Sequence, residues 1–345
     1  MIYGAYGYSA ELILEQAVKR SMKPVLAGRN QTKLQATARK FGLDFRVFDL
    51  QDRTVIAEQL RGIDLMLNCA GPFTHTINPL LTACLYEGCH YLDITGEIEA
   101  LEFAYKQARE AEDRDCVVLP GIGFDVVPTD CVALHLKERH PDSQYLTLAF
   151  ATDVEQSRGT WKSTLEALPK GGRVRQNRVI VSVPHAFKTR KIDFGDGPKL
   201  CVTIPWGDVS SAYVTTSIPN IEVYIATNGA VVFSMRLLRY FGWLLQIPGM
   251  LPLLKKLVDF TVTGPRESSR SARVVHVFGE VVDEDHRSHS HVITTPDTYT
   301  LTAHTAIEAV ARVLHSPPPG GVYTPASAFG SAFIHEVVAM MAGPR

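Results

Sequence analysis

The chain of 345 residues lacks several features that would settle its class at once. Its charges nearly cancel, with 35 Lys and Arg against 36 Asp and Glu, which argues against a nucleic-acid partner. Its six cysteines include no CxxC pair, so neither a disulfide framework nor a zinc ribbon is expected. No signal peptide precedes the first glycine motif. These absences favour a cytoplasmic protein that acts on small molecules.

A long apolar run is also missing. Residues 222–260 are mostly apolar, but Arg236 and Arg239 interrupt them, and the longest uncharged part, Tyr240–Leu254, contains two prolines. A helix of that length spans about 22 Å, less than a hydrocarbon core of about 30 Å. We therefore expect no transmembrane segment. Burial in the second domain or in a homodimer is favoured, and peripheral contact with a membrane or lipid is the alternative.

What the chain does contain begins at its first residue. Met1–Tyr3 suits a short strand, a glycine-rich turn follows, and residues 11–20 have a helical pattern. Strand, tight glycine turn and helix are typical of dinucleotide-binding folds, where the backbone approaches a pyrophosphate at the helix N-terminus. The expected cofactor-binding residues of this turn are Gly4, Tyr6, Gly7, Tyr8, Ser9 and Ala10. A strand-turn-helix without a ligand is the alternative.

Strands and helices then alternate as far as residue 125. The predicted strands are 24–28, 45–48, 64–68, 91–93 and 116–120, and the predicted helices are 32–41, 53–60, 77–87 and 97–114. Such alternation with short loops predicts an α/β fold, a Rossmann-type doubly wound parallel sheet, over residues 1–125.

The rhythm changes after residue 125. Predicted strands are 144–152, 177–183, 200–204, 222–226, 273–282 and 288–294, with helices at 129–139 and 299–314. This pattern predicts a second, α+β domain over residues 126–320 for substrate binding and dimerisation. Thr324 and Pro325 predict the start of a last helix, residues 324–345, which we expect to pack back on the first domain.

The end of the second predicted strand indicates which dinucleotide would bind. It reads Ala27-Gly28-Arg29-Asn30, and Lys33 follows one turn into the helix. An acid at this place suits the ribose of NAD, whereas Arg suits the 2′-phosphate of NADP. Arg29, Asn30 and Lys33 therefore predict NADP, and a solvated surface Arg is the alternative.

Two further strand ends extend the expected cofactor site. Asp49 follows the third strand, where such folds meet the adenine, and the fourth strand ends in a loop of small residues that would approach the ribose. The cofactor-binding residues expected in that loop are Asn68, Ala70, Gly71, Pro72 and Phe73. A tight loop without a ligand is the alternative.

Candidates for proton transfer follow the later strands. Asp125 and Tyr91 are the expected catalytic residues, because they lie near strand ends that face the cofactor crevice. Asp93 and Asp130 could serve proton transfer or substrate recognition, but helix capping is favoured for both.

Two further motifs have structural explanations. The three histidines within residues 286–291 lack carboxylate or thiolate partners nearby, so a surface hairpin is favoured over a metal site and no metal is expected. Residues 159–163 could open a helix that binds a substrate carboxylate or that is merely capped there.

Taken together, motifs along nearly the whole chain resemble the saccharopine dehydrogenase-like oxidoreductases, a group that includes the trans-acting enoyl reductases of mycobacteria. The motifs are Tyr3–Ala10, Leu26–Asn30, Asn68–Phe73, Tyr91–Glu97, Pro120–Asp125, Ile204–Val209, Ile218–Glu222, Thr263–Pro265 and Tyr323–Ala326. The second half is more similar to the bacterial and enoyl-reductase branch.

The resemblance implies an NADP-dependent enzyme that delivers hydride to a polarised C=C or C=N bond of a small or acyl substrate. The alternative is a non-catalytic NADP-binding protein whose apolar second domain contacts lipid or a partner.

Overall fold

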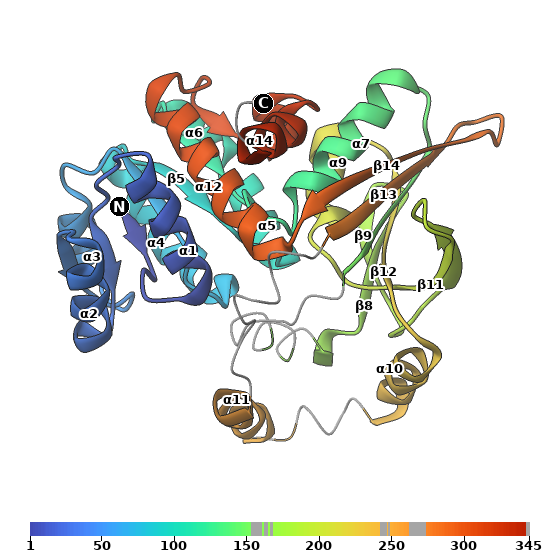
Figure 1. Ribbon diagram of the computed structural model, residues 1–345, viewed down its shortest axis with the longest axis horizontal. Helices are drawn as coiled ribbons and strands as arrows, with labels where there is room; N and C mark the ends of the chain where they lie inside the picture. Colours follow the sequence, from blue (N-terminus) through green and yellow to red (C-terminus); the bar gives the residue numbers. More distant parts are fainter. Residues whose placement is uncertain are drawn as a thin grey trace. The chain divides into compact units, whose positions relative to one another are not determined.

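The computed structural model describes residues 1–152, 161, 165, 168–241, 247, 249–261 and 274–342. The chain divides into two compact units (Figure 1). Unit 1 comprises Met1–Val127, Tyr299–Phe329 and Phe333–Arg345, and unit 2 comprises Pro128–Thr298 and Gly330–Ala332. Unit 2 is thus inserted between two parts of unit 1.

Unit 1 contains a seven-stranded sheet in which every neighbouring pair is parallel. Its strands are β1 (Ile2–Tyr3), β2 (Leu26–Gly28), β3 (Phe45–Val47), β4 (Leu65–Asn68), β5 (His90–Asp93), β6 (Val117–Leu119) and β15 (Gly321–Val322). The order β15-β6-β5-β4-β1-β2-β3 places β1 between β2 and β4, where the order of the strands across the sheet reverses. This confirms the predicted doubly wound fold.

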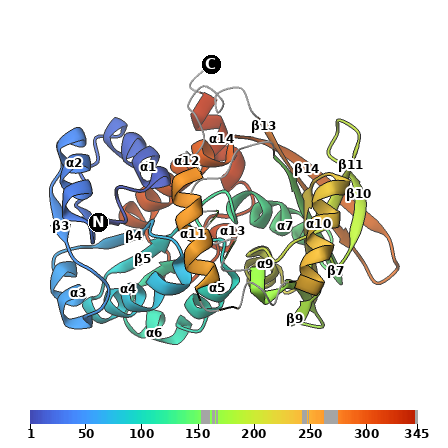
Figure 2. The same ribbon diagram turned by 90° about the horizontal axis from the view of Figure 1, so that it is seen from below.

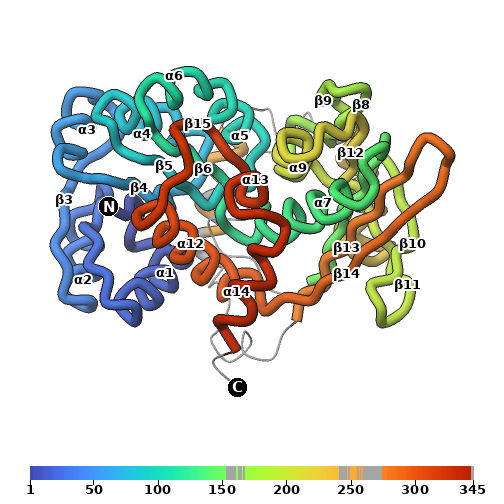
Figure 3. The backbone as a smooth tube through the Cα atoms, turned by 90° about the horizontal axis from the view of Figure 1, so that it is seen from above, coloured from blue at the N-terminus to red at the C-terminus, as the bar shows by residue number. Residues whose placement is uncertain are grey.

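Helices cover both faces of this sheet. They are α1 (Tyr8–Lys19), α2 (Gln31–Phe41), α3 (Arg53–Leu60), α4 (Phe73–Glu87), α5 (Ile98–Tyr105), α6 (Ala108–Asp113), α12 (Thr298–His315), α13 (Pro325–Phe329) and α14 (Phe333–Ala342). Figure 3 shows α3, α4 and α6 on one side and α1, α2 and α12 on the other. Helices α2 and α4 both end at glycines in the left-handed region, Gly42 and Gly88, which satisfy the last carbonyls.

Several predictions for unit 1 differ from the structure. The last helix, predicted over 324–345, is two helices, α13 and α14, because the chain turns at Gly330, which has a φ of +84°. The helix predicted over 97–114 is two helices, because the N–H of Gln107 bonds the carbonyl of Ala104, three residues back, and this tighter turn separates α5 from α6. The helix predicted at 299–314 was assigned to the second domain, but α12 clusters with unit 1. Thr302 Oγ1 accepts a hydrogen bond from Phe124 N at 3.0 Å, which ties the helix to the loop after β6.

Unit 2 is built on a mixed eight-stranded sheet. Its strands are β7 (Tyr145–Ala151), β8 (Gly172–Gln176), β9 (Val179–Val183), β10 (Thr189–Asp193), β11 (Pro198–Thr203), β12 (Asn220–Ala226), β13 (Val274–Val282) and β14 (Ser288–Pro296). The main path is β10-β11-β12-β7-β13-β14, and β8 pairs with β12 and β9. Only β12 and β7 are parallel neighbours, which fits the predicted α+β class.

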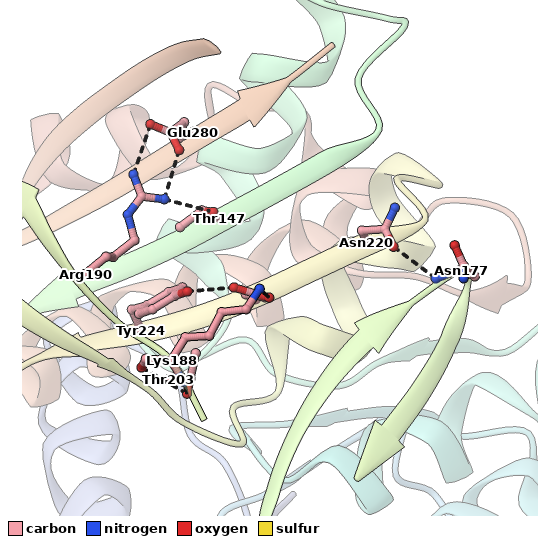
Figure 4. A network of polar contacts seen from close by, with 9 residues as sticks. Thr147, Asn177, Lys188, Arg190, Thr203, Asn220, Tyr224 and Glu280 are labelled. Atoms are coloured by element: carbon pink, nitrogen blue, oxygen red, sulfur yellow. Dashed lines mark hydrogen bonds and ion pairs between the residues drawn. The ribbon is translucent and has the colours of Figure 1, made fainter. Parts of the chain in front are cut away.

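Three predicted strands of unit 2 begin two residues away from the observed starts, which are Val179 in β9, Pro198 in β11 and Asn220 in β12, and the sequence predicts neither β8 nor β10. The strand expected at 177–183 begins at Val179, because Asn177 and Arg178 form a two-residue hairpin turn with positive φ at both positions. Asn177 N donates to Asn220 Oδ1 at 3.0 Å, which holds this turn against the start of β12 (Figure 4).

The second sheet curls strongly. Arg190 on β10 forms hydrogen bonds of 2.9 and 3.2 Å with Glu280 on β13, although three strands separate β10 from β13 in the sheet (Figure 4). Phe194 and Phe278 lie in the apolar cluster that this curvature encloses.

The helical elements of unit 2 are η1 (Leu168–Lys170), α7 (Val127–Arg139), α9 (Asp208–Thr216), α10 (Gly229–Phe241) and α11 (Met250–Thr261). Helix α7 packs directly on β13 at Gly279, where an added Cβ would lie 2.4 Å from Val132 Cγ1. The motif of residues 159–163 falls almost entirely outside the described residues, as do residues 263–265.

The apolar stretch around residues 240–254 is partly exposed in the single chain. Tyr240, Ile247 and Leu253 are exposed, so these three side chains are not buried within the second domain, and their burial in a homodimer stays a prediction. Residues 242–246 and 248 lie outside the described part of the chain. No helix in the described ranges is long and apolar enough to cross a membrane.

We expect the substitution Gly279→Ala to lower the free energy of unfolding by about 1–3 kcal/mol, because the new methyl group overlaps Val132 in a packed interface. Gly229→Ala is the matched control, since nothing lies within 4 Å of a Cβ built there. Urea unfolding of both variants measures the effect. Equal stabilities would contradict the packing of α7 on β13.

Candidate functional site

The carboxyl ends of three neighbouring strands, β2, β1 and β4, lie together at one edge of the unit 1 sheet. Strand β1 lies between β2 and β4, and its Tyr3 is level with Ala27 on one side and Asn68 on the other. Gly4 N donates to Ala27 O at 2.8 Å and Cys69 N donates to Tyr3 O at 2.9 Å, so the three chain segments leave the sheet together. In open α/β sheets, ligands bind at such a switch point.

The glycine turn after β1 leaves no room for side chains. Gly4 has φ of +77°, and a Cβ there would lie 2.9 Å from the backbone nitrogen of Ala70. At Gly28 an added Cβ would lie 2.7 Å from the ring of Tyr6, so this ring rests on the end of β2. The turn therefore brings three predicted cofactor-binding segments into contact.

Helix α1 differs from the next three helices at its start. Asn30 caps α2 through a bond from Lys33 N of 3.0 Å, and Asp52 caps α3. Glu97 accepts from the first N–H groups of α4. The cap of α1 is Gly7, which has no side chain to offer. The first turn of α1, with Tyr8, Ser9 and Ala10, therefore has no side-chain cap, and a helix N-terminus of this kind can receive an anion such as a phosphate.

The residues predicted to choose between NAD and NADP lie beside this turn. Arg29 and Lys33 are exposed, at the end of β2 and in the first turn of α2. Burial raises the pKa of the Tyr3 hydroxyl, and the charges of Arg29 and Asp49 also act on that pKa, which places both near Tyr3. Asp49 also accepts a hydrogen bond from Gln51 N at 3.0 Å.

A buried chain of hydrogen bonds supports the loop that follows β4. Asn68 Oδ1 accepts from Ala70 N at 2.9 Å, and Asn68 Nδ2 donates to the hydroxyl of Tyr91 at 3.1 Å. Tyr91 donates in turn to Asp93 at 2.9 Å, and Asp93 also accepts from the N–H of Gly121 at 2.9 Å. Every one of these polar side chains is fully buried, so this network of hydrogen bonds fixes the strand ends.

Burial is the main reason why the pKa of Asp93 rises to about 6. Its carboxylate binds the N–H of Thr95 and Gly121 and caps no helix, so the favoured helix-cap reading of Asp93 is wrong. Asp130 lies inside α7 rather than at its cap, and it accepts a hydrogen bond from Thr215.

Glu97 is a site residue that the sequence prediction missed. Its carboxylate accepts from Phe73 N at 2.9 Å and from Thr74 N at 2.8 Å, and thereby holds the loop of Gly71, Pro72 and Phe73. Glu97 closes the Tyr91–Glu97 motif, but nothing in the sequence indicates which N–H groups it binds, because they lie more than twenty residues earlier.

Asp125 lies against the backbone beside Glu97. A Cβ built on Gly96 would be 2.7 Å from Asp125 Cβ, so the absence of a side chain at Gly96 makes room for this carboxyl group. Burial, and secondarily the charge of Glu97, raises the pKa of Asp125 to about 7. A half-buried carboxyl group with a pKa near neutrality can give or take a proton under physiological conditions.

The histidines of the predicted hairpin do lie on a hairpin. His289 on β14 stacks on His140, the residue after α7, with ring centroids 3.7 Å apart, and His291 stacks on His135 of α7 at 4.4 Å. Across the described ranges, no group of three or more His, Cys, Asp or Glu side chains is placed to hold a metal ion.

The comparisons with known proteins agree with this geometry. Residues 1–116 match the family described as the saccharopine dehydrogenase NADP binding domain. The human saccharopine dehydrogenase-like oxidoreductase is 23% identical over 204 residues, which cover 52% of this chain and 48% of that protein. The chain thus spans about half the length of this relative. A saccharopine dehydrogenase from Saccharomyces cerevisiae has the same fold, with a TM-score of 0.62, 12% identity and coverage of 98% and 95%.

Two other relatives bear different names. A trans-acting enoyl reductase of Mycobacterium ulcerans is 29% identical over 150 residues, which cover 40% of this chain and 35% of that protein. A lipid droplet localized protein of Caenorhabditis elegans is 24% identical over 408 aligned positions, which cover 98% of this chain and 95% of that protein.

Arg29 should determine the preference for NADP over NAD. We expect Arg29→Ala to weaken NADP binding by about 1.5–3 kcal/mol, because charge-assisted hydrogen bonds to the 2′-phosphate are lost, and to leave NAD binding nearly unchanged. Titration calorimetry with both cofactors measures the difference. Arg39→Ala, near the far end of α2, is the control. Equal losses for NADP and NAD would show that Arg29 acts elsewhere.

Proposed function

We propose that this chain, which carries a saccharopine dehydrogenase NADP-binding domain in residues 1–116, is an NADP-dependent oxidoreductase that reduces a polarised C=C or C=N bond of a small or acyl substrate. The observation that carries the proposal is the position of Asp125. Its carboxyl group lies beside Glu97, which holds the loop predicted to bind the cofactor, and its pKa is raised to about 7. The proposal places the protein in the cytoplasm and keeps a homodimer as its expected assembly.

The cofactor fits the residues that are present. The uncapped first turn of α1 and the bare backbone of Gly4 and Gly7 would hold the pyrophosphate, and Arg29 with Lys33 would hold the 2′-phosphate. Asn30 caps α2 through its side-chain oxygen and leaves its amide group for the same region. When bound, NADPH supplies the hydride.

The chain itself supplies the proton in this proposal. Reduction of a C=C or C=N bond adds a hydride to one atom and a proton to the other, so a general acid is required. Asp125 is favoured over Tyr91 as the general acid. Asp125 is half-buried and has a pKa near 7, whereas the Tyr91 hydroxyl is fully buried and donates a hydrogen bond to Asp93. Tyr91 then acts by positioning Asp93.

The relatives support both bond types. The enoyl reductase of Mycobacterium ulcerans supports a C=C bond, and the saccharopine dehydrogenase-like relatives support a C=N bond. The matches to the human and Mycobacterium relatives cover only part of this chain, so the experiment includes substrates with each bond type.

The experiment is a substrate panel. Purified protein is incubated with NADPH and with enoyl thioesters of increasing chain length or with cyclic and linear imines, and oxidation of NADPH is followed by absorbance. Gly7→Val is the control, since a Cβ beside the pyrophosphate should abolish NADP binding while the fold stays cooperative. Tight NADP binding without turnover of any compound would favour the alternative, a non-catalytic NADP-binding protein whose second domain contacts lipid or a partner.

Asp125 should determine the pH dependence of the reaction. As a general acid it works while protonated, so kcat should be constant below its pKa of about 7 and fall as the pH rises through that value. Asp125→Asn should lower kcat by about 10²–10⁴-fold and remove this alkaline limb.

Glu97→Gln provides the second arm of this test. Removing the negative charge of Glu97 makes deprotonation of Asp125 easier, so the alkaline limb should move to lower pH. An Asp125→Asn variant that keeps its rate and its pH profile would exclude Asp125 as the proton donor.

A further inference from the structure

Helix α10 exposes a stripe of large apolar side chains. Phe233, Leu237 and Tyr240 are 64%, 40% and 74% exposed, and their spacing of four and three residues places them on one face of the helix. Isolated exposed apolar residues are common on protein surfaces, but three of this size in one row are not.

The opposite face of α10 is fixed to the second sheet, where Figure 2 shows the helix running along it. Val232 packs with Ala186 and Val202 in a small apolar cluster. The guanidinium group of Arg239 donates to the carbonyls of His185 and Ala186, both at 2.7 Å. The exposed stripe is therefore held outward by specific contacts on the other side of the helix.

The sequence that surrounds the stripe carries charge of one sign. Between Glu222 and Asp259 the sequence contains four basic residues and no acidic residue, although the whole chain has a net charge of −1. The basic residues are Arg236, Arg239, Lys255 and Lys256. Arg236 is exposed and lies on the same face as the stripe, one turn after Phe233. This composition is complementary to a negatively charged surface.

A second copy of the chain fits this face poorly. In a twofold interface the same patch meets itself, so each exposed Arg236 would approach basic groups of the partner with no acid from residues 223–258 to pair with them. An anionic lipid surface satisfies both features at once, because phenyl, leucyl and tyrosyl groups enter the headgroup region while basic groups contact the phosphates.

We propose that the α10 stripe, Phe233, Leu237 and Tyr240 with Arg236, binds the protein peripherally to an anionic phospholipid bilayer. The helix would lie in the plane of the headgroups, in agreement with the finding that no described helix is long and apolar enough to span a membrane. This inference is independent of the proposed reaction, since it concerns a surface of unit 2 that contains none of the predicted catalytic or cofactor-binding residues.

The test is flotation of the full chain with two kinds of vesicle. One consists of phosphatidylcholine and phosphatidylglycerol in equal parts, and the other of phosphatidylcholine alone. We expect the protein to float with the anionic vesicles, to float much less with the neutral ones, and to be released by salt, because screening weakens the contribution of the basic groups.

Substitutions locate the contact. The double variant Phe233→Ser/Tyr240→Ser should bind anionic vesicles at least about tenfold more weakly, because two large apolar groups no longer leave water. Tyr86→Ser is the control, since Tyr86 is 67% exposed on α4 of unit 1 and should not matter. Arg236→Glu should weaken binding, whereas Arg236→Lys should preserve it.

Three outcomes would overturn the proposal. The first is no flotation with anionic vesicles, and the second is flotation that the double variant does not reduce. The third is a combination of results: the wild-type protein is a dimer in light scattering and does not bind vesicles, and the double variant is a monomer. That combination would assign the stripe to contact with a second copy. Thermal unfolding of each variant checks that the fold is kept.

Discussion

The close approach of two backbones at Gly4 and Ala70 is the constraint on which the site depends. No side chain fits between them, and Gly4 takes a conformation that favours glycine. This approach lets β1 and β4 end side by side, and α1 then starts without a side-chain cap directly above the sheet edge. The residues for a dinucleotide phosphate and the loop held by Glu97 are consequently neighbours.

Below this edge, buried hydrogen bonds add to the apolar packing of the core. Asn68, Tyr91 and Asp93 form a buried chain in which each polar group has a partner. Such chains are stable only when all members are satisfied, so a change at one member disturbs the others. The two carboxyl groups with raised pKa values differ in their surroundings, since Asp93 is fully buried and Asp125 is half-buried beside Glu97.

Much of unit 1 could be predicted from sequence, because its order depends on local signals. The glycine turn, the left-handed Gly42 and the Thr324 cap, which accepts a hydrogen bond from Ser327 N at 3.1 Å, are all visible in a few residues. The task of Glu97 could not be predicted, since its partners are distant in sequence. Strands β8 and β10 were missed for a related reason: their alternation is weak, and pairing with β9 and β11 decides their structure.

The insertion of unit 2 into unit 1 affects the order in which the protein is made. Residues 1–127 leave the ribosome first, but α12 covers their sheet and β15 completes it only after residues 128–298 of unit 2 have been synthesised. Until then one edge of β6 is unpaired. Arg20 also lacks its ion-pair partner until then, because Glu308, which lies 2.7 Å from it in the folded protein, follows 288 residues later in the sequence. Unit 1 can therefore complete its fold only late in synthesis, through contacts between residues far apart in sequence. Unit 2 consists almost entirely of one continuous segment.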